Sequence, residues 1–168
     1  MKMRTHLVRS SVTSTCAAAL LLLATGCGAS EGGAEPASTS KRLPDGDACS
    51  LLPKKAANRI LETNDTETTP ADYQCDFSSQ TGFDSFNVIR GQDMSKMTTG
   101  ESVDISGVGG ERLEATDSGC GVSVKLDSGD PKQQFAVVSI VNQGGDLQKD
   151  ACAVADKAAE SIIRNLPE

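Results

Sequence analysis

Histidine and tryptophan are almost missing from this sequence. Of its 168 residues, one is histidine and none is tryptophan. The single histidine, His6, lies in an N-terminal segment that we expect to be removed, so the rest of the chain has no imidazole. Catalysis by a histidine base and the usual histidine-bound zinc and copper sites are therefore excluded there. We predict no catalytic residue, no metal site and no cofactor.

Aromatic residues and basic clusters are also scarce. Aromatic residues form 3% of the sequence, too few for broad platforms on which sugars or bases stack. Without Lys2, Arg4 and Arg9 of the expected signal, the 16 basic residues fall to 13, against 23 acidic residues. Phosphate contacts need clustered lysine and arginine, so we expect no nucleic acid partner. The acidic balance also argues against broad adhesion to anionic lipid.

Only one long apolar run is present, at residues 12–24. It is shorter than the ~20 apolar residues that a membrane-spanning helix needs, and basic residues precede it. This pattern predicts an export signal over residues 1–26.

The apolar run ends in Ala24-Thr25-Gly26-Cys27. These residues resemble the lipobox of bacterial lipoproteins, although Ala24 stands where leucine is usual. The resemblance implies that Cys27 receives a diacylglycerol and becomes the new N-terminus. An ordinary cleaved signal and a transmembrane anchor are the alternatives. With lipid on Cys27, the protein is expected on the extracytoplasmic face of the cell membrane.

The chain after Cys27 divides into a tether and a domain. Residues 28–46 are mostly glycine, serine, alanine, glutamate and proline, a composition typical of a flexible linker. We therefore predict a lipidated cysteine and tether at residues 27–46. Residues 47–168 are long enough to bury one core, and we predict a single domain there.

A first helix is predicted from apolar residues at spacings of three and four. They are Leu52, Ala56, Ala57, Ile60 and Leu61. Pro53 suits the first turn, where its missing N–H has no partner to lose. Lys54, Lys55 and Arg59 fall on the other side, a small basic face that is either solvated or meets an anionic partner.

A second helix is predicted at the C-terminus, with Asp146 as its N-cap. Its apolar positions again follow spacings of three and four. They are Leu147, Ala151, Val154, Ala158, Ile162 and Leu166. Glu160 and Arg164 are spaced to pair on the exposed side.

Between the helices, alternating apolar residues predict five or six antiparallel strands. The predicted strands are residues 73–78, 83–90, 103–105, 113–115, 120–126 and 135–141. Residues 62–72 and 91–100 are polar and are predicted as loops. Gly107-Val108-Gly109-Gly110 lacks a phosphate-binding motif, so we expect a tight turn or bulge there. The fold class is α+β: an antiparallel sheet with an N-terminal and a C-terminal helix packed on it.

Four cysteines remain once Cys16 leaves with the signal and Cys27 is lipidated. They are Cys49, Cys75, Cys120 and Cys152. An even number in an oxidising compartment predicts two disulfides, for which three pairings exist. Proximity in the sequence favours Cys49–Cys75 and Cys120–Cys152, whereas the crossed pairings close longer loops. Free thiols and a four-thiolate metal site are the alternatives.

Several short motifs occur in order along the chain. They are the lipobox, Asp47-Ala48-Cys49-Ser50-Leu51-Leu52, Tyr73-Gln74-Cys75-Asp76, Gly107-Val108-Gly109-Gly110-Glu111, Cys120 with Val122 and Val124, and a terminal helix near Cys152. Together they resemble the actinobacterial lipoproteins of unknown function related to mycobacterial LprB and LprC (domain of unknown function 3558). The chain departs from that pattern at Asp76-Phe77, where an aromatic residue, often tryptophan, commonly follows the second cysteine, and at Arg112, where alanine is usual. The resemblance implies the same two disulfides and brings no catalytic residues.

Two functions are compatible with these features. The first is a non-catalytic binding or accessory module, tethered to the membrane through Cys27, for an envelope protein or a small-molecule ligand. The alternative is a hydrolase or transferase of the envelope that uses two of Asp72, Asp76, Asp84 and Asp104. Paired carboxylates about 5–10 Å apart in one cleft would favour the enzyme. Asp127 and Asp130 could together bind a calcium ion, but no third carboxylate lies nearby in the sequence.

Overall fold

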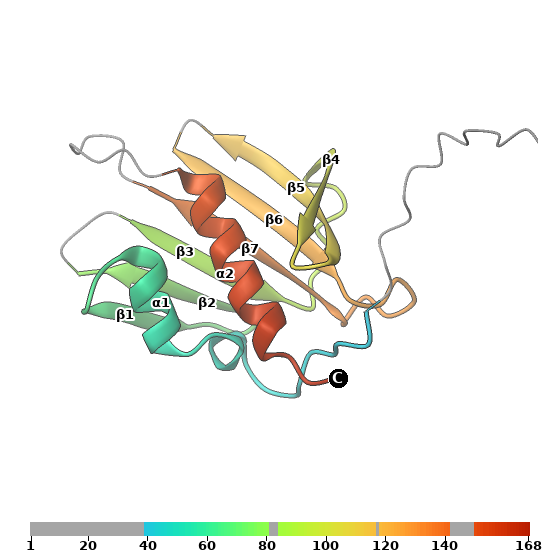
Figure 1. The fold of residues 1–168 in the computed structure, drawn as a ribbon, viewed down its shortest axis with the longest axis horizontal. Coiled ribbons are helices and arrows are strands. Elements are labelled where there is room, and N and C mark those ends of the chain that lie inside the picture. The colour runs from blue at the N-terminus through green and yellow to red at the C-terminus, as the bar shows by residue number, and fades with distance from the viewer. Residues whose placement is uncertain (1–38, 81–83, 117, 142–149) are drawn as a thin grey trace, which may run out of the picture. The chain divides into compact units, whose positions relative to one another are not determined.

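The computed structural model describes residues 39–80, 84–116, 118–141 and 150–168, all within the unit Ala34–Glu168 (Figure 1). The expected signal and Cys27 therefore lie outside the described residues. In chain order, the described elements are η1 (Ala48–Leu51), α1 (Lys54–Leu61), β1 (Thr66–Pro70), β2 (Gln74–Ser79), β3 (Ser85–Arg90), β4 (Thr98–Ile105), β5 (Val108–Thr116), β6 (Gly119–Lys125), β7 (Gln134–Ile140) and α2 (Ala151–Asn165).

The strands form one antiparallel sheet in the order β1-β2-β3-β7-β6-β5-β4. The α+β class and the antiparallel sheet are as predicted, but the described residues form seven strands, not five or six. Figure 1 shows α1 and α2 over the same face of this sheet. We call that face the inner face and the opposite one the outer face.

The additional strand is β1, which the polar sequence predicted as a loop. It is an edge strand that pairs only with β2, and only Thr66 of its five residues is buried. The Ala71 N–H donates to the Gln74 carbonyl, so Glu67 and Thr69, at alternate positions, are the residues bonded to β2. Pro70 therefore faces the free edge, where its missing N–H leaves no gap in the ladder.

The glycine-rich stretch between β4 and β5 is a turn followed by a strand. Ser106 and Gly107 have φ angles of 55° and 82°, the two positive values that a two-residue hairpin turn of type I′ requires. Gly110 belongs to β5, and a Cβ there would lie 3.0 Å from the Ser123 carbonyl oxygen and 3.2 Å from Val122 Cγ2. The predicted tight turn thus occupies residues 106–107, and glycine at 110 permits close packing.

Helix α1 buries the apolar stripe that the sequence predicted. Pro53 lies just before the helix and Glu62 ends it in a left-handed conformation. Helix α2 begins at Ala151, where the Asp150 carboxylate accepts hydrogen bonds from the N–H groups of Cys152 and Ala153, at 2.9 and 3.4 Å. The predicted N-cap, Asp146, lies outside the described residues.

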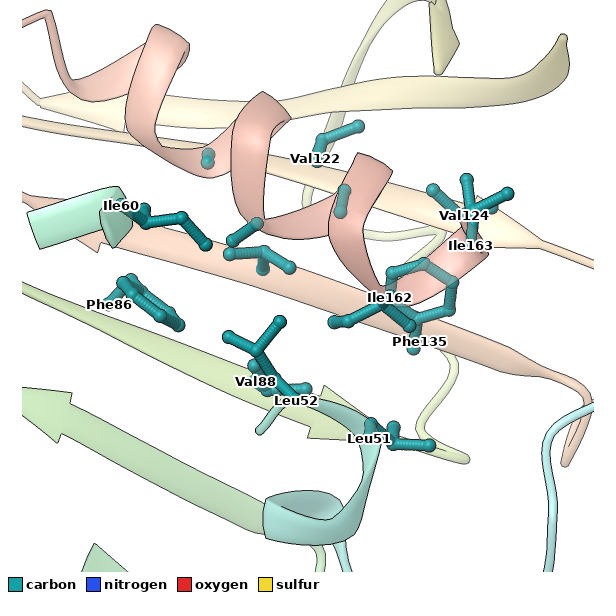
Figure 2. Close-up of a cluster of buried hydrophobic side chains, with 14 of the residues drawn as sticks. Leu51, Leu52, Ile60, Phe86, Val88, Val122, Val124, Phe135, Ile162 and Ile163 are labelled. Atoms are coloured by element: carbon teal, nitrogen blue, oxygen red, sulfur yellow. The ribbon is translucent and has the colours of Figure 1, made fainter. Parts of the chain in front are cut away.

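The core lies between the helices and the inner face (Figure 2). Phe86 and Val88 of β3 and Phe135 of β7 are at most 1% exposed. The rings of Phe77 and Phe86 stack with centroids 5.0 Å apart. Buried alanines on α2 let this helix pack closely on β6 and β7.

Both disulfides have the pairing that the sequence predicted. Cys49 of η1 is bonded to Cys75 of β2, and Cys120 of β6 to Cys152 of α2. The Cα–Cα distances are 5.0 and 4.9 Å, within the usual range for disulfides. Each half of the sheet is thereby linked to the helical segment that covers it.

Part of the predicted tether is folded against the domain. Leu43 is 5% exposed and belongs to the main core cluster. The Arg42 N–H donates to the Pro167 carbonyl at 3.1 Å, and Arg90 donates to the Gly46 carbonyl at 2.8 Å. Ordered contacts therefore begin before Asp47, the predicted start of the domain, because Leu43 joins the core and the backbone of Arg42 and Gly46 bonds to groups elsewhere in the chain.

Candidate binding surface

The connection from β3 to β4 crosses the outer face of the sheet. Three strands separate β3 from β4, so residues 91–97 must pass over or around them. Met94 is 8% exposed and packs in a cluster with Leu113 and Ala136, together with Ile89 and Val138. These strand residues belong to the outer face, because they alternate with the core residues of their strands. The connection therefore covers part of the face that the helices leave open.

The covered and uncovered parts of the outer face differ in burial. Ala136 and Ser123 are at most 4% exposed, although the helices lie on the other face. Val138 is half-buried and Ile140 is 52% exposed. We call the uncovered outer residues of β2, β3 and β7 the open patch. They are Asp76, Ser78, Ser85, Asn87, Val138 and Ile140.

The polar centre of the open patch has an unused acceptor. Asn87 Nδ2 donates to Asp76 Oδ1 at 2.5 Å, across the β2–β3 pair. Asn87 Oδ1 is buried and has no hydrogen-bond partner among the described residues. A buried acceptor without a donor costs about 1–3 kcal/mol, and burial closes this atom to donors from outside.

Charges around the open patch are all of one sign. The outer-face residues of β1, β2, β3 and β7 include Glu67 and Asp76 and no lysine or arginine. Gln80 Nε2 donates to Glu67 Oε1 at 2.9 Å. A surface with carboxylates beside aliphatic side chains suits a ligand that brings cationic donors.

The four carboxylates weighed for catalysis do not gather at one place. Asp104 is on β4, five strand positions from Asp76 on β2, which corresponds to roughly 24 Å. Asp72 precedes β2 and Asp84 follows it, so these two lie at opposite ends of that strand. Of the four, the open patch contains Asp76 alone, with Asn87 as its partner.

Asp127 and Asp130 both accept hydrogen bonds from other groups of the chain. Asp127 accepts hydrogen bonds from Arg42 Nη1 at 2.5 Å and from the Gly129 N–H at 2.8 Å. The Arg42 bond, followed by the Gly129 bond, holds the pKa of Asp127 below its ordinary value. Asp130 accepts from the Lys132 N–H at 2.8 Å. No group of three or more potential ligands for a metal ion occurs in the described part of the chain.

An ion pair that the sequence did not reveal joins β5 to α2. Arg112 Nη1 and Nη2 lie 2.7 and 3.2 Å from the two carboxylate oxygens of Asp156. The side chains are 13% and 30% exposed, and the hydrogen bond to Asp156 is the main cause of the raised pKa of Arg112. Forty-four positions separate the two residues, too far for any local pattern to signal the pair.

The predicted basic face of α1 is present. Lys54, Lys55 and Arg59 are exposed on the side of the helix away from its buried stripe. No helix within the described ranges is long and apolar enough to span a membrane.

Comparison with family models, curated proteins and solved structures found no match. The resemblance to the LprB and LprC lipoproteins stays a prediction, and so does lipidation at Cys27.

Proposed function

We propose that the protein is a lipid-anchored, non-catalytic binding module of the cell envelope that presents its open patch to a partner protein. The observation that carries the proposal is the outer face of the sheet. Its central strand, β7, has an apolar outer side that the chain covers at Ala136 and leaves exposed at Ile140. Val138 and Ile140, together with the Asp76 carboxylate, give this face the mixed apolar and polar character of a protein interface.

The chemistry of the open patch favours a partner with basic and aliphatic side chains. Val138 and Ile140 offer apolar area, while Asp76 offers a carboxylate acceptor. A lysine or arginine on the partner would donate to the Asp76 carboxylate. Such charge complementarity fixes orientation and partner choice more than it raises affinity.

The location in the envelope is supported by the two disulfides. Disulfides form and persist outside the reducing cytosol, and each one here links a helical segment to the sheet. The apolar run and the Gly26-Cys27 pair supply the route of export and the attachment point.

The anchor is tested with the full chain and Cys27→Ala. We expect wild-type protein to incorporate labelled fatty acid and to fractionate with membranes. Cys27→Ala removes the acceptor thiol and should lose both properties. Equal labelling of the two proteins, or no labelling of either, contradicts the anchor.

The open patch is tested with a photo-cross-linking residue in place of Ile140, in intact cells. Asn165, exposed at the end of α2, is the control position. We expect a protein cross-link from position 140 and none from position 165, and we expect Asp76→Lys to reduce its yield by at least tenfold. Equal cross-linking from both positions, or a yield that charge reversal leaves unchanged, contradicts this surface.

A further inference from the structure

The helical side of the molecule carries a group of exposed basic residues. Helix α1 contains Lys54, Lys55 and Arg59 and no acidic residue, and all three are exposed. On α2, the exposed Lys157 adds a fourth cation. These four residues form no ion pair among the described residues. We call the exposed surface made by these four residues the cationic helix side.

The acidic residues of α2 do not cancel these charges. Asp156 is held by Arg112, and Glu160 lies 3.2 Å from Arg164 on the next turn. Each carboxylate of α2 thus has its own arginine. Outside α2, the exposed Asp47 and Glu62 lie at the two ends of the η1–α1 segment, so the positive charge is concentrated on the cationic helix side itself.

Two of the lysines occupy positions that helix physics disfavours. Lys54 and Lys55 lie in the first turn of α1, which has no acidic residue. The N-terminal end of a helix is the positive end of its dipole, so cations there are destabilising and acids are preferred. Proteins tend to violate such local preferences at functional sites. The two exposed lysines are therefore candidates for a role in an interaction.

The outer face carries the opposite sign. Its alternating positions include Glu67, Asp76, Asp104 and Glu111, against one lysine, Lys125. The outer strand positions thus carry mainly negative charge, whereas the cationic helix side lies across the sheet from them. Since solution screening acts over about 8 Å at physiological salt, an approaching surface responds to the near face and not to the net charge of the chain.

The length of the proposed tether keeps the domain close to the bilayer. Eleven residues lie between Cys27 and Thr39, the first residue that the structure describes. Even fully extended, they reach no more than about 43 Å. With a lipid on Cys27, contact between the domain and the bilayer becomes an intramolecular event, for which a few charges suffice.

We propose that the cationic helix side docks on the anionic phospholipid headgroups of the membrane that holds the Cys27 lipid. This inference rests on the proposed lipid anchor. Docking in this orientation turns the outer face, with the open patch, away from the bilayer and toward envelope partners. The acidic net charge of the chain predicts no broad adhesion to anionic lipid. Because the exposed cations of α1 and α2 lie together on the helical side, the domain can adhere through that side alone.

The test measures the reactivity of individual lysines in the lipidated full-length protein. The protein is placed in phosphatidylcholine vesicles with and without phosphatidylglycerol, treated with an amine-acylating reagent, and analysed by mass spectrometry. We expect anionic lipid to slow acylation of Lys54, Lys55 and Lys157 by about fivefold, and high salt to abolish the difference. Lys96 and Lys125, both exposed and on the outer-face side, are internal controls and should not change.

A matched pair of double variants sharpens the test. Lys54→Gln with Lys55→Gln should abolish the protection of Lys157, whereas Lys96→Gln with Lys125→Gln should preserve it. Protection of all lysines alike, or of none, overturns the proposal. Because the same spectra show whether Cys27 carries lipid, absence of the anchor is distinguished from failure of an anchored protein to dock.

Discussion

The two faces of the sheet differ in how they are covered. The inner face carries the three fully buried phenylalanines and both disulfides, and two helices close it. Among the described residues, the outer face is covered by Met94 and its loop, and Ile140 is 52% exposed. The difference indicates that buried apolar packing is concentrated on the inner face.

Truncating one large residue on each face tests whether the two faces contribute differently to stability. Phe86→Ala removes a ring that is 1% exposed and stacked on Phe77, and should lower the free energy of unfolding by about 3–5 kcal/mol. Ile140→Ala removes a side chain that is 52% exposed and should cost about 0.5 kcal/mol. Urea denaturation measures both. Similar losses from the two variants would contradict the division between the faces.

The next largest effect concerns the disulfide between α2 and the inner face. Replacing Cys120 and Cys152 together by serine should lower the free energy of unfolding by about 3–4 kcal/mol, given a sequence separation of 32. Urea denaturation under oxidising conditions measures the loss. With enough reductant to open both disulfides, the variant and the wild type should become nearly equal. A gap that persists after full reduction would show that the cysteines contribute mainly through packing.

A smaller effect separates the half-buried ion pair of the inner face from a solvent-exposed pair on the same helix. Asp156→Ala leaves Arg112 with a 13%-exposed side chain and no carboxylate, which should cost about 1–3 kcal/mol. Glu160→Ala breaks the exposed pair with Arg164 and should cost about 0.3–0.5 kcal/mol. Thermal and urea unfolding of the two variants compare them. Equal costs would mean that burial adds nothing to the Arg112 pair.

Much of the inner face could be predicted because its signals are local. The alternation of Cys75 with Phe77, and of Cys120 with Val122 and Val124, identifies β2 and β6 from the sequence alone. The apolar spacing in α2 does the same for that helix. Each pattern arises because one side of the element is buried, which is the condition under which periodicity appears.

The features that were missed depend on long-range contacts or lack burial. Strand β1 has no alternation because four of its five residues are exposed at the sheet edge. Met94 packs on Leu113 and Ala136 because of the order of the strands in the sheet. A short stretch of sequence carries no information about that order. The open patch has the same origin, since Asn87 and Ile140 come together only through pairing of β3 with β7.

The smallest predicted effect lies at the rim of the sheet, where the chain arrives from the tether. Asp127 binds Arg42, and the Leu43 N–H donates to Gln133 Oε1 at 2.8 Å. The folded-state pKa of Asp127 is lowered from its ordinary value of 3.8. Its contribution to local stability is therefore complete above about pH 4–5 and is lost as the pH falls below 3.8 through the folded-state value.

Amide hydrogen exchange at Arg42 and Leu43 measures this contact directly. At pH 6, Asp127→Asn should speed exchange at both amides by a few-fold relative to wild type, because the N-terminal segment loses an ionic partner. As the pH falls below the lowered folded-state pKa of Asp127, the two proteins should converge because the wild-type carboxyl becomes protonated. Asp130→Asn, in the same loop but without a contact to Arg42, is the matched control and should leave both amides unchanged. Equal exchange of wild type and Asp127→Asn at pH 6 would show that Leu43 burial alone holds the segment, and that the rim, like the inner face, depends on apolar packing.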